Sequence, residues 1–165
     1  MYEYKAKIMK VVDGDTVDVD IDLGFGMVYK KQRVRMLGID TPESRTRDLV
    51  EKKFGKASKK HLKGLLEEAV SITLISHDKG KFGRILGELF VNKVDSDEDW
   101  MDESEGHQTF ESTERVSVNK QMILDHHAVE YTGENKDTTT ERHMEHRKLL
   151  VEKGTVTQEQ IDKVS

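Results

Sequence analysis

Two short polar segments in the first half of the chain hold most of the side chains that could do chemistry. One is the run Asp13–Thr16, with the sequence Asp-Gly-Asp-Thr, and the other extends from Arg35 to Glu43. Carboxylates without a nearby Cys or His favour a hard cation, and Ca²⁺ accepts Asp oxygens together with main-chain carbonyls. Arg35 and Arg84 add fixed positive charge, so the set suggests a phosphodiester bound beside a metal ion.

A single proline shapes the second polar segment. Pro42 fixes the turn between Thr41 and Glu43 and biases Thr41 toward an extended conformation. We therefore expect the Thr41 carbonyl and the Glu43 side chain to point in defined directions.

The elements that must position these segments are predicted to be strands. Alternating apolar and polar residues, with short turns between them, indicate an antiparallel meander of three strands. These strands are expected at Tyr4–Val12, Thr16–Leu23 and Met27–Leu37. In such a meander, both polar segments can meet near one end of the sheet.

Beyond Glu43 the apolar period changes from two residues to about 3.6. This spacing predicts a helix over Asp48–Val70, in which Gly55 and Gly64 are weak points. Two short strands are expected next, at Ile72–Ile75 and Ile85–Val91. The first half therefore predicts five strands interrupted by one helix.

The second half of the chain is more polar. Asp95 to Glu114 contains nine acidic residues and no Lys or Arg, and so little apolar surface predicts a mobile loop. Helical patterns follow at Asn119–Tyr131 and Thr138–Lys153, and a capping box starts a last short helix at Thr157–Gln160. We expect one domain over residues 1–153 with an acidic loop insertion at 95–114, and a short C-terminal tail or helix over 154–165.

Composition limits the function classes. The 165 residues fit one domain, and the absence of Cys excludes disulfides, thiolate zinc sites and a Cys nucleophile. The net charge of −5 divides into +5 for residues 1–93 and −10 for residues 94–165, which permits a local anion site in the first half. With 36% charged residues, no membrane-length apolar run and no signal-peptide layout, we expect a cytoplasmic protein without membrane contact.

These motifs together resemble the staphylococcal-nuclease (thermonuclease) family. The matching pieces are Val12–Val17, Arg35–Glu43, Asp78–Lys79 with Lys81–Arg84, and more weakly Val118–Asn119. The likeness covers Lys5 to about Val91, in the family's order. It implies an α+β fold in which an OB-type, five-stranded Greek-key barrel carries about three packed helices.

The resemblance also implies an activity and roles for particular residues. Family members are Ca²⁺-dependent nucleases that cleave phosphodiester bonds of DNA and RNA and leave 3′-phosphates. By similarity, Asp15, Asp40 and the Thr41 carbonyl would bind the metal, and Asp13 would be an outer-shell carboxylate. The catalytic residues would be Arg35, Glu43 and Arg84, with Glu43 activating water. Lys81, Phe82 and Tyr131 would contact the substrate, which is DNA, RNA or both, and we expect a monomer.

Other interpretations of the same residues stay open. The Asp-Gly-Asp run could be only an acidic turn. Phe82 could pack against the protein instead of stacking on a base. The Lys52–Lys63 face could be a solvated surface without contact to nucleic acid. The pairs His126–His127 and His143–His146 could offer imidazole to a metal, although neither has a carboxylate partner at a recognised zinc spacing. An OB-type module that binds nucleic acid or protein without cutting it is the alternative function. A third possible function is that of an interaction protein whose acidic half mimics nucleic acid.

Overall fold

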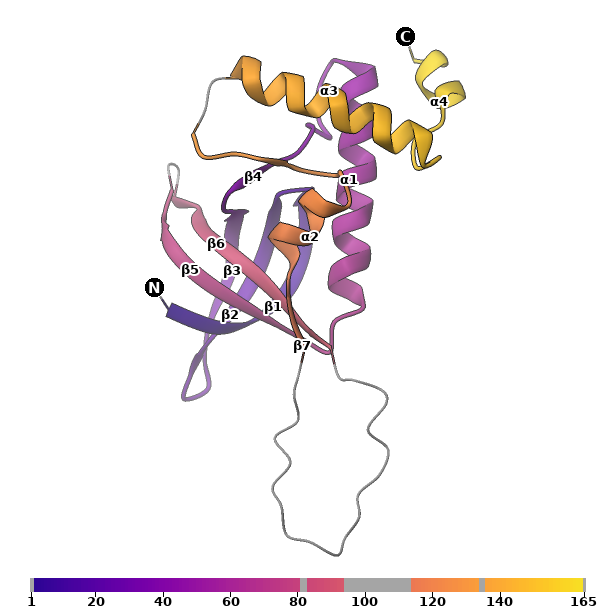
Figure 1. The fold of residues 1–165 in the computed structure, drawn as a ribbon. Coiled ribbons are helices and arrows are strands. Elements are labelled where there is room, and N and C mark those ends of the chain that lie inside the picture. Colours follow the sequence, from indigo (N-terminus) through magenta and orange to yellow (C-terminus); the bar gives the residue numbers. More distant parts are fainter. Residues whose placement is uncertain (1, 81–82, 94–113, 134–135, 165) are drawn as a thin grey trace, which may run out of the picture.

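The computed structural model describes residues 2–80, 83–93, 114–133 and 136–164. Within these ranges, strands dominate the first half and helices the second (Figure 1). The strands are β1 (Tyr2–Asp13), β2 (Thr16–Gly24), β3 (Met27–Met36), β4 (Ile39–Asp40), β5 (Ser71–Lys79), β6 (Ile85–Lys93), β7 (Glu114–Ser117) and β8 (Val129–Glu130). The helices are α1 (Leu49–Glu67), α2 (Val118–Leu124), α3 (Lys136–Glu152) and α4 (Gln158–Asp162).

Five of the strands close into a barrel. The sheet order is β3-β2-β1-β5-β6-β7, and β3 also pairs with β6, in parallel. The meander is confirmed, because β1, β2 and β3 pair antiparallel in sequence order. The expected α+β fold with a five-stranded barrel is therefore correct.

The barrel and α1 share the main hydrophobic core. Alternating residues of β2 point inward, and Val17 and Val19 are fully buried together with Leu62 of α1. Leu23, which continues the alternation, is instead 41% exposed because it lies near the turn at the end of β2. Val118 and Met122 of α2 belong to the same core, so both helices pack against the barrel.

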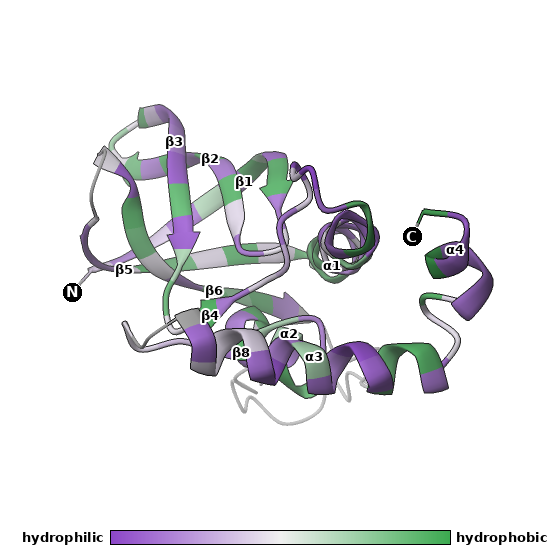
Figure 2. Cartoon of the chain, turned by 90° about the horizontal axis from the view of Figure 1, so that it is seen from above, coloured by the Kyte–Doolittle hydropathy of each residue, from purple (hydrophilic) through white to green (hydrophobic). Residues whose placement is uncertain are grey.

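A second, smaller core joins the C-terminal helices to α1. Phe54 of α1 packs with Leu150 of α3 and with Val156, which precedes α4. Figure 2 shows α3 as mostly hydrophilic, with a hydrophobic stretch near its C-terminal end. Figure 1 shows α3 crossing the end of the barrel where β4 lies. This packing holds α3 at the end of the barrel that carries the polar segments.

The second half departs from its predicted elements. The helix expected over Asn119–Tyr131 ends at Leu124, since His126 has a positive φ of 64° and the chain then forms β8. The short strands β4 and β8, which pair with each other, are too brief to leave a periodic pattern. The acidic loop expected at 95–114 lies outside the described residues, apart from Glu114 at the start of β7. Among the helices that are described, none has the length and apolar content needed to cross a membrane.

Candidate active site

Arg35 is the centre of the polar cluster at the end of the barrel. Its Nη1 lies 3.1 Å from Asp15 Oδ2, and its Nη2 lies 3.2 Å from Asp40 Oδ1. Nη1 also donates to the carbonyls of Met36 and Ile39, at 3.2 and 3.0 Å. One planar guanidinium therefore fixes two carboxylates and the chain leading from β3 into β4.

Asp15 is buried at the start of β2, only 8% exposed. Its Oδ1 accepts from the Thr16 hydroxyl at 2.8 Å, and its Oδ2 accepts from the Thr41 amide at 3.1 Å. Burial raises the pKa of Asp15 above its usual value, and the Asp40 charge acts the same way, although Arg35 and the two hydrogen bonds oppose them. The two predicted polar segments are thus in direct contact.

The segment that carries Thr41 and Glu43 is held from both sides. Asp13 Oδ1 accepts from the Ser44 hydroxyl and from the Ser44 amide. On the other side, Glu51 of α1 accepts from the Glu43 amide at 3.3 Å. The turn that Pro42 predicts is therefore tied to β1 and to the first turn of α1.

Two glycines allow this close approach. A Cβ on Gly14 would lie 2.8 Å from Ser58 Cβ and 3.1 Å from the Thr41 side chain. A Cβ on Gly55 would lie 2.3 Å from the Glu43 carbonyl oxygen and 2.6 Å from the Ser44 amide nitrogen. Since real Cβ contacts are longer than 3.0 Å, only glycine lets α1 and the β1–β2 turn pack on the Thr41–Ser44 segment.

Glu43 faces this cluster with an exposed side chain. Partial loss of hydration raises the pKa of Glu43, and the negative charges of Asp13, Asp15, Asp40 and Glu51 raise it further. A carboxylate with a raised pKa is a better proton acceptor at neutral pH than an ordinary Glu.

Asp40 has a second partner that comes from α3. His143 Nε2 lies 2.8 Å from Asp40 Oδ2, so each oxygen of this carboxylate contacts one basic side chain. The side chain of His143 is only 14% exposed. The next residue back on the helix, Arg142, donates to the Glu130 carbonyl of β8 at 2.9 Å. Two neighbouring residues therefore fasten α3 to the β4–β8 pair.

The donor set fits a hard divalent cation. Among the described residues, no three His, Asp or Glu side chains are gathered as a ready-made metal site. Asp15 and Asp40 nevertheless lie on one guanidinium, and Thr41 Oγ1 beside them is buried without a hydrogen-bond partner. Burial is the main reason why the pKa values of Asp15 and Glu43 are raised, so a cation beside them would stabilise their ionised forms. Carboxylate and main-chain oxygens suit Ca²⁺, and Asp15, Asp40 and Thr41 could hold it.

The structure describes the positions of Arg84 and Tyr131, two further residues of the predicted site. Arg84 immediately precedes β6, whose parallel pairing aligns Ile85 with Val34, so its backbone lies close to that of β3 near Arg35. The Tyr131 amide donates to the Gly38 carbonyl at 2.9 Å, which places the partly exposed Tyr131 beside the same chain segment. The predicted contacts Lys81 and Phe82 lie outside the described residues.

Four other histidines that the structure describes make contacts away from Arg35, Asp15 and Asp40. The rings of His61 and His127 stack at 4.3 Å, and His61 Nε2 contacts Asp125 at 2.6 Å. His146 meets His126 edge to face at 5.2 Å, so the pair His143–His146 is divided between two environments. The alternative of an imidazole metal site thus finds no support in the described part of the chain.

Asn119 positions α2 against the barrel through hydrogen bonds that the sequence alone does not predict. Its Oδ1 accepts from the Leu89 amide at 3.1 Å, and its Nδ2 donates to the carbonyls of Leu37 and Gly87 at 2.9 and 3.3 Å. This buried amide joins α2 to β6 and to the chain that leaves β3. Only the weak Val118–Asn119 motif pointed to it.

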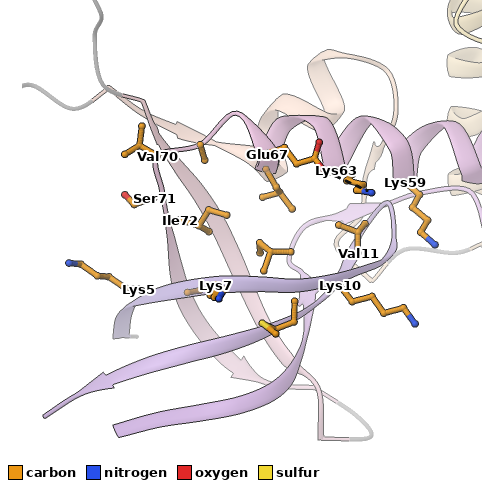
Figure 3. Close-up of a pocket in the computed structure, with 15 residues that line it drawn as sticks. Lys5, Lys7, Lys10, Val11, Lys59, Lys63, Glu67, Val70, Ser71 and Ile72 are labelled. Carbon is orange, nitrogen blue, oxygen red and sulfur yellow. Dashed lines mark ion pairs between the residues drawn. The ribbon is translucent and has the colours of Figure 1, made fainter. Parts of the chain in front are cut away.

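A groove of about 820 Å³ lies away from the carboxylates, between β1 and α1. Its lining includes Lys5, Lys7 and Lys10 of β1 and Lys59 and Lys63 of α1, as Figure 3 shows. Its floor is apolar, and none of the carboxylates or arginines of the candidate site lines it. It is a cationic surface on which a polyanion could rest.

The chain has recognisable relatives among known proteins. A family described as "Staphylococcal nuclease homologue" matches residues 33–150. A thermonuclease of Staphylococcus hyicus is 32% identical over 92 residues, covering 55% of this chain and 51% of that protein. An uncharacterized protein of Bacillus anthracis is 37% identical over 94 residues, covering 54% of this chain and 40% of the relative.

A second thermonuclease, from Staphylococcus intermedius, is 32% identical over 88 residues, covering 51% of this chain and 47% of that protein. The chain spans about half the length of the curated relatives that it matches. The family match begins within β3, at Arg33, and ends within α3, at Leu150. It therefore includes Arg35, Asp40, Thr41, Glu43, Arg84 and His143. With its barrel and this match over most of its length, the chain belongs to the staphylococcal nuclease family.

Proposed function

We propose that this protein is a Ca²⁺-dependent nuclease that hydrolyses phosphodiester bonds of DNA and RNA and leaves 3′-phosphate ends. The observation that carries the proposal is the Arg35 guanidinium between Asp15 and Asp40, with Glu43 beside them. Family membership supports nuclease-type hydrolysis. A module that only binds nucleic acid has no need for this combination of acids and guanidiniums.

Each residue has a chemical task in this proposal. Glu43 accepts a proton from water, whose oxygen then attacks the phosphorus, and the bond from phosphorus to the 5′ oxygen breaks. The leaving 5′ oxygen takes a proton from solvent water and becomes a 5′-hydroxyl end, while the other strand end keeps the 3′-phosphate. Arg35 and Arg84 bind the phosphate oxygens and stabilise the charge that grows on them. Asp15, Asp40 and the Thr41 carbonyl would hold Ca²⁺, which supplies Lewis-acid charge stabilisation when bound.

The second candidate function is nucleic-acid binding without cleavage. The groove between β1 and α1 favours it, since five lysines and a single acidic side chain, Glu67, are among the residues that line it, and neither Asp15 nor Asp40 does. Electrostatic binding of this kind needs no metal and weakens steeply with salt. The two candidates therefore differ in their dependence on calcium.

One experiment separates them. The purified protein is incubated with end-labelled single-stranded DNA, duplex DNA and RNA, in calcium or in a chelator, alongside Glu43→Gln and Arg84→Ala. We expect calcium-dependent cutting with 3′-phosphate ends, and about a hundredfold or greater loss in each variant. If the unmodified protein binds the labelled strands but does not cut them, the binding module is favoured instead.

A further inference from the structure

The helix α3 contributes one side chain to the carboxylate cluster. His143 Nε2 contacts Asp40 Oδ2 at 2.8 Å, across 103 positions of sequence. The opposite oxygen of Asp40 contacts Arg35 Nη2 at 3.2 Å. A carboxylate with a donor on each oxygen has little freedom to rotate, because either rotation breaks a hydrogen bond.

The chemistry of the contact settles how His143 can act there. An ionised carboxylate only accepts hydrogen bonds, so His143 Nε2 must carry the hydrogen that Asp40 accepts. A ring nitrogen that carries this hydrogen has no free lone pair for a metal ion. His143 is therefore suited to orient Asp40 and unsuited to coordinate a cation through the same atom.

The position of His143 distinguishes it from an ordinary helix anchor. Arg142, its neighbour, also fastens α3 to the barrel end, but it does so through the Glu130 carbonyl of β8. Leu150 fastens the far end of α3 by packing with Phe54 and Val156. The helix thus has several attachments that do not involve Asp40, including the contact of His146 with His126, whereas the His143 contact is directed at the carboxylate itself.

We infer that His143 is a positioning residue that orients Asp40 for calcium binding, and that α3 is thereby part of the nuclease site. This inference rests on the proposed function, in which Asp40 is a calcium ligand. Hydrogen-bond partners of metal ligands typically contribute about 10- to 100-fold in metal affinity. Loss of the His143 donor should therefore weaken calcium binding while leaving the ligands themselves in place.

The test measures calcium affinity directly, by isothermal titration of the full chain with CaCl₂. His143→Leu removes the donor with little change in volume, whereas His143→Gln keeps an N–H group at similar reach. Arg142→Ala is the matched control, because it loosens the same helix without touching Asp40. Urea unfolding in a chelator reports whether each variant remains folded.

We expect calcium binding about 10- to 100-fold weaker in His143→Leu, and within about threefold of the unmodified protein in His143→Gln and Arg142→Ala. The calcium concentration for half-maximal cleavage should rise in parallel, while kcat at saturating calcium changes by less than about threefold. A merely structural role would instead lower stability in His143→Leu and Arg142→Ala alike.

The outcomes separate this inference from the proposed function. If the unmodified protein binds calcium and cuts, but His143→Leu matches it in calcium affinity, the inference is wrong and the proposed function stands. Equal losses in His143→Leu and Arg142→Ala would also overturn the inference. If the unmodified protein neither binds calcium nor cuts, the proposed function fails, and the inference that rests on it fails too.

Discussion

Replacing Gly55 by alanine tests how closely α1 must approach the catalytic segment. The new Cβ would lie 2.3 Å from the Glu43 carbonyl oxygen and 2.4 Å from its carbon. Ordinary contacts begin at 3.4 Å, so the segment carrying Glu43 must retreat from α1 by about 1 Å. A displacement of that size near reacting groups costs about a hundredfold in rate.

The stability change expected for Gly55→Ala is smaller than the change in rate. Alanine favours a helix interior by about 1 kcal/mol over glycine, and overpacking costs about 1–3 kcal/mol. The net loss in the free energy of unfolding is therefore about 0–2 kcal/mol. Gly64→Ala in the same helix is the control, because its Cβ would meet no atom within 4 Å. It should gain up to about 1 kcal/mol and keep its full rate.

The assay pairs urea unfolding with single-turnover cleavage of labelled single-stranded DNA in saturating calcium. We expect Gly55→Ala to cut about a hundredfold more slowly than Gly64→Ala. Equal rates in the two variants, with Gly55→Ala as stable as Gly64→Ala, would refute the proposed packing of α1 against Glu43.

Three further changes test the charges and hydrogen bonds around the site. The raised pKa of Glu43 means that its ionised form opposes folding, so Glu43→Gln in a chelator should be more stable than the unmodified protein at pH 7. That difference should vanish in urea unfolding below pH 4.5, where Glu43 is protonated in both states. Burial lowers the pKa of His127 to about 4, so His127 gains a proton in the unfolded chain at a higher pH than in the folded protein. The free energy of unfolding therefore falls as the pH drops from 6.5 to 4. His127→Gln should show a shallower fall in thermal unfolding, and an unchanged slope would contradict this explanation. Asn119→Ala removes the side-chain partner of the Leu89 amide and of the Leu37 carbonyl, while the Gly87 carbonyl keeps the Leu37 amide at 2.8 Å. The variant should cost about 2–3 kcal/mol in urea unfolding, whereas a loss below about 1 kcal/mol would argue against that role.

The sequence predicts the barrel strands and the convergence of the two polar segments well. Alternation over Thr16–Leu23 indicates the inward side chains of β2 as far as Ile21 but fails at Leu23, which is exposed. The long helix ends within three residues of its expected C-terminus. The approach of Asp15 to the Thr41 amide follows from a meander, because turns at one end of neighbouring strands lie close together.

Contacts between distant segments were not predictable in the same way. In the sequence, Gly55 is only a weak point of a helix. The structure shows why glycine is needed there, because the Glu43 carbonyl lies against it. The pair His143–His146 shares a helical face and suggests a common ligand. In the structure, however, His143 contacts Asp40 and His146 contacts His126. Strands of two residues, such as β4 and β8, carry no periodicity from which to predict them.

The Arg35 guanidinium is the feature on which the whole site depends, so Arg35→Lys is the most direct test. Lysine keeps the positive charge but cannot bridge Asp15 and Asp40 with two parallel donors. The measurement is the cleavage rate of single-stranded DNA as a function of calcium concentration, for Arg35→Lys and for the unmodified protein. We predict calcium-dependent cleavage by the unmodified protein, with a rate about 100- to 1000-fold lower and a higher calcium requirement in Arg35→Lys. Equal rates, or cleavage that persists in a chelator, would contradict the proposed site.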